Sequence, residues 1–263
     1  DVYVIQPTYA PVGERLLELL LIADACRRAG AATITAVMPY LGYARQDRRS
    51  TRREPLSTRV IANAVEAGGI DRVVTVDLHS PPSEGCWGIP FAHLTALPLL
   101  APYLKSSMAT ASIVVAPDLG AMKRAEAFAK LLNLPVAVVH KSRLGGADVV
   151  AKGVLGTVRG LAPILVDDVI ATAGTIEEAV RSLREAGCAN PLTVVVTHAL
   201  LAGPALERLA RLDLARLVCT DSIPLRHTES LPIEVVSLAP LLAEEIRVHT
   251  GLPRSEAAEI VAR

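Results

Sequence analysis

Two acids follow an apolar run in the segment ILVDDVIATAGT, which spans residues 164–175. The apolar residues Ile164–Val166 predict a short strand that is buried on both faces. Asp167 and Asp168 come at the carboxyl end of this predicted strand, where carboxylates can accept hydrogen bonds from sugar hydroxyls or bind a hydrated divalent cation. The segment therefore predicts a phosphosugar site. A strand that ends in a helix-capping acid is the alternative.

Small residues complete this segment just before a predicted helix. Apolar residues recur with helical spacing over Ile176–Ala186, and Gly187 marks the expected end of that helix. Small side chains let several backbone N–H groups converge on a ligand, and a helix N-terminus adds about half a positive charge. We therefore expect a phosphate group to bind here. The candidate loop residues are Ala171, Thr172, Ala173, Gly174 and Thr175.

Basic and amide side chains follow the predicted strand Thr33–Met38 in the loop Gly42–Arg49, which reads GYARQDRR. Arg45 could bind a polyphosphate through two parallel hydrogen bonds, and Gln46 could recognise a base edge. This loop is a candidate nucleotide site. A solvated charged surface is the alternative.

Two further predicted strands end beside possible metal ligands. His79 follows the strand Arg72–Val76, and Asp118 follows the strand Ser112–Ala116. An imidazole and a carboxylate from two strand ends could flank one Mg²⁺ ion, with water filling the other octahedral positions. For His79 alone, an ordinary hydrogen-bonding histidine is the alternative.

A pair of cations, Lys141 and Arg143, follows the predicted strand Val136–Val139 and precedes two glycines, Gly145 and Gly146. Cations on a mobile, glycine-rich loop can close over transferring phosphates and neutralise charge in the transition state. A polar turn is the alternative reading of these residues.

Strand-like runs alternate with amphipathic helical segments along the whole chain. The predicted helices include Glu14–Ala29, Ser57–Ala67, Lys123–Leu132 and Ile176–Ala186. Further strands are predicted at Val2–Gln6, Leu192–Val196, Leu217–Cys219 and Ile233–Val236. This alternation predicts an α/β fold with mostly parallel sheets, in which ligands bind at the carboxyl ends of the strands.

A weak internal repeat indicates that the α/β pattern occurs twice. Thr33–Gly42 resembles Ser112–Gly120, and Arg72–His79 resembles Pro163–Val169, because each is an apolar strand that closes on similar residues. Two similar halves in tandem are the expected explanation.

Composition narrows the possible functions. The 263 residues are 51% hydrophobic with a formal net charge of zero, so the chain can bury a large core and shows no bias toward nucleic acids or membranes. No apolar run reaches the roughly 18 residues of a membrane-spanning helix. Four cysteines without CxxC spacing argue against a zinc site and favour reduced thiols in a cytoplasm. Because a strand is predicted directly at Val2, the N-terminal part is expected to be truncated.

Taken together, these motifs resemble the ribose-phosphate pyrophosphokinases, also called phosphoribosyl pyrophosphate synthetases. The blocks that carry the resemblance are Val2–Gln6, Pro39–Gln46, Asp77–His79, Pro117–Asp118, Lys141 with Arg143, Asp167–Thr175, Thr197–Pro204 and Leu238–His249. The resemblance implies two tandem domains of the phosphoribosyltransferase type. They would be an incomplete, ATP-binding domain at 1–95, a ribose 5-phosphate-binding domain at 96–240, and a C-terminal helix at 241–263 that returns towards the first domain.

The resemblance also implies a reaction. The pyrophosphoryl group of ATP would be transferred to the C1 hydroxyl of ribose 5-phosphate, with Mg²⁺ as cofactor and AMP as second product. By motif, Arg45 and Gln46 would bind ATP, His79 and Asp118 would contact Mg²⁺, and Lys141 with Arg143 would come from a catalytic flexible loop. Ribose 5-phosphate contacts are implied for Arg143, Asp167, Asp168 and Ala171–Thr175. A cytoplasmic, dimer-based homo-oligomer such as a hexamer is implied as well.

Some residues depart from the family pattern. Ala171 has no polar side chain where the family has Asp or Ser, and the region Ser80–His93 after the histidine motif is irregular. These departures motivate a second hypothesis, a non-catalytic regulatory subunit that assembles with a true synthetase. A third hypothesis is a phosphoribosyltransferase that acts on a base, although such enzymes have one copy of the domain and lack a loop like Gly42–Asp47.

Overall fold

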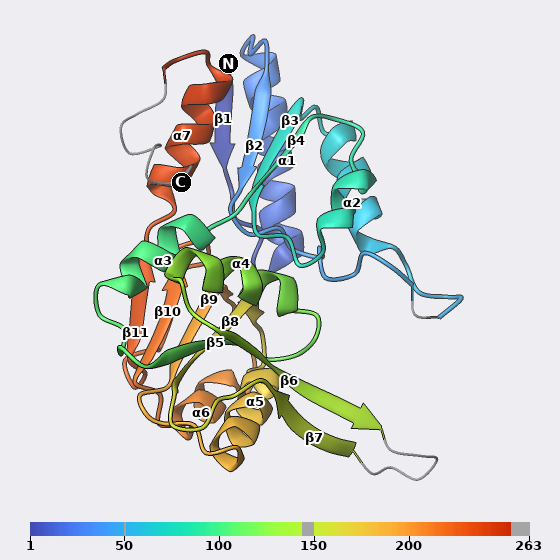
Figure 1. Cartoon of the computed structure of the whole chain (residues 1–263). Helices are drawn as coiled ribbons and strands as arrows, with labels where there is room; N and C mark the ends of the chain where they lie inside the picture. The colour runs from blue at the N-terminus through green and yellow to red at the C-terminus, as the bar shows by residue number, and fades with distance from the viewer. Residues whose placement is uncertain (50, 144–149, 254–263) are drawn as a thin grey trace. The chain divides into compact units, whose positions relative to one another are not determined.

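The computed structural model of the chain describes residues 1–49, 51–143 and 150–253 (Figure 1). It divides into two compact units, residues 1–95 and 96–263. Each unit contains its own parallel sheet, so the expected α/β fold with mostly parallel sheets is confirmed. No helix in the described ranges is long and apolar enough to cross a membrane.

The first unit is built around a parallel sheet in which β1, β2, β3 and β4 lie side by side in chain order. Its elements are β1 (Val2–Ile5), α1 (Val12–Arg28), β2 (Ile34–Met38), α2 (Ser57–Ala67), β3 (Arg72–Val76), the 3-10 helix η1 (Pro81–Cys86) and β4 (Phe91–Leu94). All residues of β2 are buried, as expected for a central strand of a parallel sheet. Residues of α1 and α2 share one core cluster with β2, which places both helices on the same face of the sheet.

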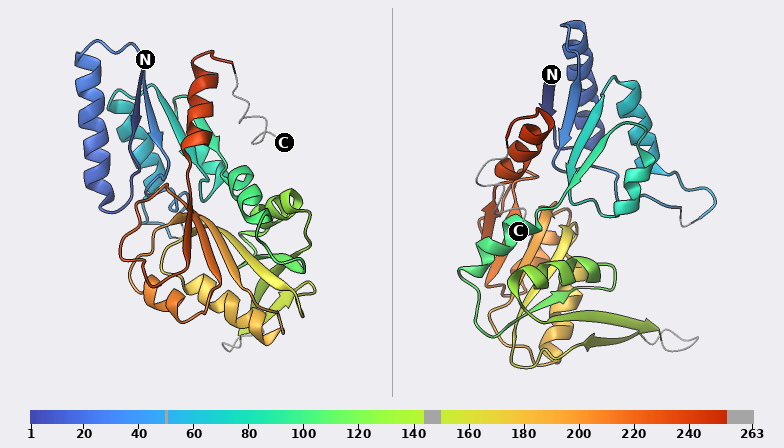
Figure 2. Two further views of the ribbon diagram at one scale, coloured as in Figure 1. Left: turned by 90° about the vertical axis from the view of Figure 1, so that its left-hand side faces the viewer. Right: turned by 45° about the horizontal axis from the view of Figure 1, so that its top comes forward.

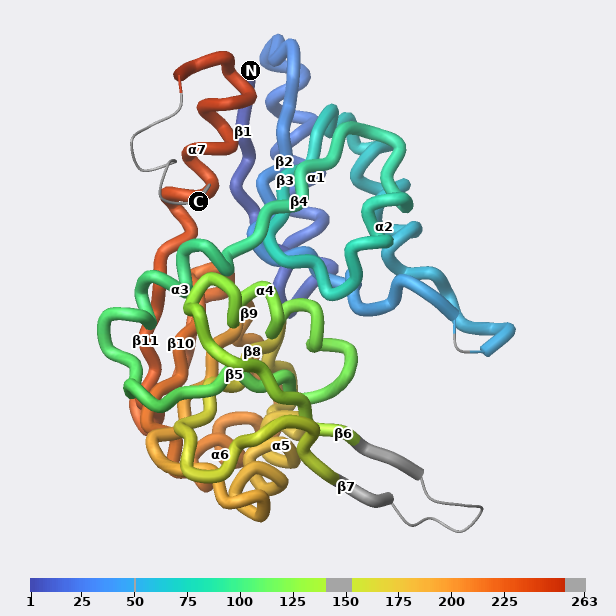
Figure 3. The backbone as a smooth tube through the Cα atoms, in the orientation of Figure 1, coloured from blue at the N-terminus to red at the C-terminus, as the bar shows by residue number. Residues whose placement is uncertain are grey.

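The second unit has a larger sheet with the described order β11-β10-β9-β8-β5-β6-β7. Its elements are α3 (Leu97–Lys105), β5 (Ser112–Ala116), α4 (Met122–Leu132), β6 (Val136–Arg143), β7 (Val150–Leu155), β8 (Ala162–Ile170), α5 (Gly174–Glu185), β9 (Thr193–Ala199), α6 (Ala205–Ala210), β10 (Arg216–Thr220), β11 (Ile233–Val236) and α7 (Ala239–His249). Every pairing is parallel except that of β6 with β7, whose two strands can be followed in the tube view (Figure 3).

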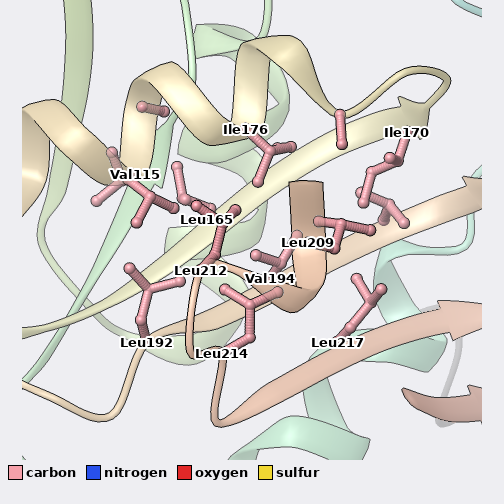
Figure 4. Packing of buried hydrophobic residues seen from close by; sticks show 14 of the residues in the cluster. Val115, Leu165, Ile170, Ile176, Leu192, Val194, Leu209, Leu212, Leu214 and Leu217 are labelled. Carbon is pink, nitrogen blue, oxygen red and sulfur yellow. The ribbon is translucent and has the colours of Figure 1, made fainter. Parts of the chain in front are cut away.

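Helices cover both faces of this second sheet, with α3 and α4 on one side and α5 and α6 on the other (Figures 1 and 2). The α5 face holds the main core of the unit (Figure 4). There Ile176 of α5 and Leu209 of α6 pack in one cluster with Leu165 of β8 and Val194 of β9. Each of these helices has apolar residues along one side. Packing against the apolar face of the sheet buries those residues.

Two strands that carry candidate site residues, β8 and β6, run further than the sequence predicts, and this corrects the placement of those residues. β8 continues to Ile170, so Asp167 and Asp168 lie within the strand and not after it. The cause is pairing with β9, which extends through the register Asp167↔Val196 to Ile170↔Ala199. β6 likewise continues through Lys141 to Arg143, because β7 supplies an antiparallel partner.

The internal repeat is present in the strand order, but in a different register from the expected one. In both units four consecutive parallel strands neighbour one another, β1 to β4 in the first and β8 to β11 in the second. Thr35 pairs with Arg72 in one unit as Thr193 pairs with Arg216 in the other. The equivalent of β2 is therefore β9 and not β5, which the resemblance of Thr33–Gly42 to Ser112–Gly120 predicts.

The same register matches the helices that follow the last strands. Both α3 after β4 and α7 after β11 start with a proline in the first turn, and residues 98–101 and 240–243 both read PLLA. The expected return of residues 241–263 towards the first unit stays a prediction, and residues 254–263 lie outside the described ranges.

Candidate active site

Three carboxylates lie at the carboxyl edge of the second sheet. Asp167 and Asp168 are near the end of β8, and Asp118 follows β5, the strand that pairs with β8. Asp168 is buried with 8% of its surface exposed, and Asp167 is partly buried. Burial raises the pKa of Asp167 to about 8, with further contributions from the negative charges of Asp168 and Asp118. This edge therefore favours a cation or a hydrogen-bond donor such as a sugar hydroxyl.

Asp118 is held in place by the turn that leads into α4. Its Oδ1 accepts a hydrogen bond from the Ala121 N–H at 3.1 Å. A Cβ at Gly120 would lie 3.1 Å from the same oxygen, so a larger residue there would require a small shift of the Asp118 carboxylate. One carboxylate oxygen is thus engaged by the backbone while the side chain remains partly exposed.

The small-residue loop joins β8 to α5, as the sequence predicts. α5 begins at Gly174, and the preceding Ala173 adopts a left-handed conformation with φ 61° and ψ 8°. Thr172 and Thr175 are exposed, whereas Ala173 is buried. Ala173 has no polar side chain that could cap α5, so its first turn presents backbone N–H groups that suit an anion.

Residues from the β9–α6 region support this loop and were missed by sequence reasoning. The Ala202 N–H donates to the Ala171 carbonyl at 2.8 Å, and Arg208 Nη1 donates to the Thr172 carbonyl at 2.9 Å. Arg208 lies 36 residues beyond Thr172 in the chain, so no local spacing could indicate the contact.

The candidate nucleotide loop follows β2 in the first unit and is anchored on α2. The Ser57 hydroxyl donates to Gln46 Oε1, and the Thr58 N–H donates to the Gln46 carbonyl at 3.3 Å. The Gly42 N–H donates to Thr8 Oγ1 at 2.7 Å. Arg45 is exposed next to these fixed residues. The loop is thus held at Gly42 and at Gln46, while the Arg45 side chain between them is exposed.

His79 follows β3, the parallel neighbour of β2, so it belongs to the same carboxyl edge as the Arg45–Gln46 loop. The turn that carries it is fixed by His93 of β4, which the sequence did not single out. The Leu78 N–H donates to His93 Nε2 at 2.8 Å. His93 Nδ1 therefore carries the proton and donates to Glu84 Oε1 at 2.7 Å. His79 itself is exposed.

The structure thus gathers the expected residues at two sheet edges. Arg45, Gln46 and His79 belong to the first unit, and Asp118, Asp167, Asp168 and Ala171–Thr175 belong to the second. Lys141 and Arg143 pair through their backbones with Lys152 and Val150, and their side chains lie outside the described residues. Among the residues that the structure describes, no group of three or more His, Cys, Asp or Glu could hold a metal.

Two family models match the chain. One, the N-terminal domain of ribose phosphate pyrophosphokinase, matches residues 1–69, and the other, a phosphoribosyl transferase domain, matches residues 104–223. The second match includes Asp118 and the whole β8–α5 loop.

Curated relatives extend the similarity over nearly the whole chain. The ribose-phosphate pyrophosphokinase of Caldanaerobacter subterraneus subsp. tengcongensis is 43% identical over 259 residues, which cover 97% of this chain and 82% of the relative. That of Bacillus caldolyticus is 43% identical over 94% of this chain and 78% of the relative. The crystal structure of phosphoribosylpyrophosphate synthetase from Mycobacterium smegmatis is similar with a TM-score of 0.88 and 37% identity, over 95% of this chain and 83% of that one.

Proposed function

Because the chain belongs to the ribose-phosphate pyrophosphokinase family, we propose that it transfers the pyrophosphoryl group of ATP to the C1 hydroxyl of ribose 5-phosphate. The products are phosphoribosyl pyrophosphate and AMP. The observation that carries the proposal is the identity of about 43% to enzymes of that name over more than 90% of the chain. These names favour the catalytic hypothesis over a regulatory subunit.

In this proposal the β8–α5 loop binds ribose 5-phosphate. The backbone N–H groups of Thr172–Thr175 face the phosphate at the N-terminus of α5, which also contributes its dipole. Asp167 and Asp168 accept hydrogen bonds from the ribose hydroxyls. Ala171 contributes backbone only, and its carbonyl is already bound by the Ala202 N–H. The missing polar side chain at Ala171 therefore leaves the phosphate-binding part of the loop intact.

The first unit binds the nucleotide. Arg45 has the exposure needed to contact the phosphates of ATP, since a guanidinium binds phosphate oxygens through two donors. Gln46 has its carboxamide oxygen engaged by the Ser57 hydroxyl, which leaves its NH₂ group to donate to the base. Ser57 is thus the residue that orients Gln46.

We propose that His79 in the first unit and Asp118 in the second each contact magnesium. Both are exposed or partly exposed at strand ends, and Asp118 adds to a carboxylate edge whose charge a cation would balance. Magnesium commonly uses one or two protein ligands and completes its shell with water and substrate phosphates, so a larger protein cluster is not required. When bound, the ion neutralises charge on the polyphosphate.

Lys141 and Arg143 act as the catalytic cations, and Arg143 also contacts ribose 5-phosphate. The C1 hydroxyl attacks the β-phosphorus in line with the departing AMP, so positioning and neutralisation of charge supply most of the acceleration. A cytoplasmic location and a homo-oligomeric state such as a hexamer stay predictions.

A coupled assay for AMP release tests the function. We expect release that requires both ATP and ribose 5-phosphate as well as Mg²⁺, and we expect Lys141→Ala to lower kcat by about 100-fold or more, as loss of a transition-state charge contact does in other enzymes. The matched control is Lys130→Ala, because Lys130 is an exposed lysine at the end of α4. Pyrophosphate release that depends on a base and not on ATP would favour an ordinary phosphoribosyltransferase instead.

A further inference from the structure

Arg208 of α6 reaches across to the loop between β8 and α5. Its Nη1 donates to the Thr172 carbonyl at 2.9 Å, and its Nε lies 3.3 Å from Glu177 Oε2 in the first turn of α5. The guanidinium thus binds Thr172, which directly precedes the left-handed Ala173, and Glu177, which lies four residues after it. The Arg208 side chain is 31% exposed and that of Glu177 is 37% exposed, so the pair is partly shielded from water.

The Thr172 carbonyl shares its peptide group with the Ala173 N–H. In a trans peptide these two groups point in opposite directions. When Arg208 binds the carbonyl, the N–H of the same peptide is therefore directed away from α6. In the proposed function this N–H is one of the donors to the phosphate of ribose 5-phosphate. Arg208 acts on the side of the peptide opposite to the ligand.

The preceding peptide is fixed from the same direction. The Ala202 N–H, which comes just before α6, donates to the Ala171 carbonyl at 2.8 Å, so the Thr172 N–H also points away from the β9–α6 segment. Two consecutive N–H groups are thus set by hydrogen bonds on the far side of the loop. A concave row of such N–H groups is the usual way in which a backbone binds an anion.

The strained backbone at Ala173 and the close packing at Gly174 both indicate that the β8–α5 loop depends on its contacts with Arg208. Ala173 has φ 61°, a conformation that is uncommon for residues other than glycine and that persists where the surroundings hold it. A Cβ at Gly174 would lie 3.2 Å from Arg208 Nη1, so the guanidinium packs directly against the loop backbone. Without Arg208 the Thr172–Ala173 peptide would lose the contact that fixes its rotation.

From these contacts we infer that Arg208 is a positioning residue for ribose 5-phosphate: it orients the Thr172–Ala173 peptide so that its N–H can donate to the phosphate. The inference rests on the proposed function, since it takes the β8–α5 loop as the phosphate site. Arg208 does not need to touch the substrate for this role. Its effect belongs to the binding of the sugar phosphate and not to the binding of ATP.

Arg208→Ala is the direct test, with steady-state kinetics for both substrates and calorimetric titration of the enzyme with ribose 5-phosphate. We expect the KM and the dissociation constant for ribose 5-phosphate to rise about tenfold or more, the size expected for loss of a hydrogen bond from a charged donor. The KM for ATP should stay within about twofold. Arg208→Lys keeps the charge but has no fork, so we expect it to restore part of the affinity.

Arg211 supplies the matched control. Its Nη2 lies 3.9 Å from Glu177 Oε1, but its side chain is 66% exposed. Arg211→Ala removes an arginine next to the same carboxylate, and we expect it to leave both KM values unchanged. If Arg208→Ala fails to fold, Arg208→Lys must still raise the KM for ribose 5-phosphate relative to Arg211→Lys.

A second variant separates this inference from the proposed function. Thr175→Val changes the loop itself at an exposed position. If Thr175→Val weakens ribose 5-phosphate binding and Arg208→Ala does not, the positioning role is wrong and the loop assignment stands. If neither variant changes ribose 5-phosphate binding in an active enzyme, the loop assignment itself is wrong. An equal rise of both KM values in Arg208→Ala would also overturn the inference, because it would indicate a general structural role.

Discussion

Adjacent acids on one strand create the strongest electrostatic feature of the described residues. Asp167 and Asp168 are neighbours on β8, and the Asp168 N–H donates to Asp167 Oδ1 at 2.9 Å. That hydrogen bond lowers the pKa of Asp167, but burial and the charge of Asp168 outweigh it and raise the pKa to about 8. The protein therefore keeps a carboxyl group that is costly to ionise until a cation or a donor from the substrate approaches.

This raised pKa predicts a pH dependence of stability in the protein without metal or substrate. An aspartate in an unfolded chain has a pKa of about 3.9, so the folded state binds the Asp167 proton more tightly. The contribution of Asp167 to the free energy of unfolding should be fully present below about pH 4 and should be lost as the pH rises towards about 8. Asp167→Asn should lack this loss. Guanidinium unfolding at pH 5, 7 and 9 in the presence of a chelator measures the difference.

The control for this experiment is Glu126→Gln, which removes an exposed carboxylate from α4. Its unfolding free energy should follow that of the parent at all three pH values. Parallel curves for the parent and Asp167→Asn would mean that Asp167 is ionised normally in the folded protein.

At the scale of elements, the chemistry depends on loops that are fixed to the helix or strand beside them. The loop after β2 rests on Thr8 and on the start of α2, and the loop after β8 rests on the segment before α6 and on α6 itself. Each loop thus takes its conformation from contacts with another element, which keeps a polar loop ordered at low entropic cost on binding.

Gly42 is the point at which the nucleotide loop comes closest to its support. A Cβ there would collide with the Thr8 carbonyl oxygen and would lie 2.5 Å from Val12 Cγ1. Gly42→Ala should therefore displace the loop and lower the free energy of unfolding by about 1–3 kcal/mol, the usual cost of overpacking. We expect a higher KM for ATP with an unchanged KM for ribose 5-phosphate, measured in the coupled assay.

The matched change for Gly42→Ala is Gly13→Ala in α1. A Cβ at Gly13 meets nothing within 4 Å, so this variant should leave both KM values as they are. An unaltered KM for ATP in Gly42→Ala would show that the loop does not depend on its contact with Thr8.

At the scale of the whole molecule, the repeated strand order separates residues of the framework from residues of the site. Asp77 after β3 and Asp221 after β10 are equivalent in the repeat. Asp77 Oδ1 accepts from the Thr95 hydroxyl at 2.9 Å, and Asp221 Oδ2 accepts from the Ser237 hydroxyl at 2.6 Å. Both aspartates therefore connect neighbouring strands. Two residues further on, His79 is exposed while its equivalent Ile223 is buried, so the fold does not require the histidine.

The two equivalent aspartates differ in burial, so we expect their replacement by alanine to lower the free energy of unfolding by different amounts. Asp77 is 3% exposed, whereas Asp221 is exposed, and loss of a buried acceptor costs more than loss of an exposed one. Asp77→Ala should lower the free energy of unfolding by about 2–3 kcal/mol and Asp221→Ala by about 1 kcal/mol. Denaturant unfolding followed by circular dichroism measures both. Equal losses of unfolding free energy in the two variants would contradict the expected difference between a buried and an exposed aspartate. A changed KM in Asp221→Ala would contradict its role as a framework residue.

Local sequence patterns are sufficient to predict several strands, one helix and one loop. Apolar runs of four or five residues are enough to predict β3, β5 and β11 with their observed bounds, and helical periodicity is enough to predict those of α2. The order of acids, small residues and an amphipathic helix was enough to predict the β8–α5 loop. These features are readable because strand burial, glycine and alanine in tight loops, and helical periodicity all depend on neighbours within a few residues.

Features that depend on distant partners become visible only in the folded protein. β8 and β6 extend beyond their apolar cores because β9 and β7 pair with them, which brings Asp167, Asp168, Lys141 and Arg143 into strands. The equivalence of β2 with β9 and of β3 with β10 follows from the order and pairing of the strands in the two sheets. Arg208 and His93 hold the site through contacts with residues 36 and 15 positions away, and no periodicity in a sequence encodes a hydrogen bond between two elements that meet only after folding.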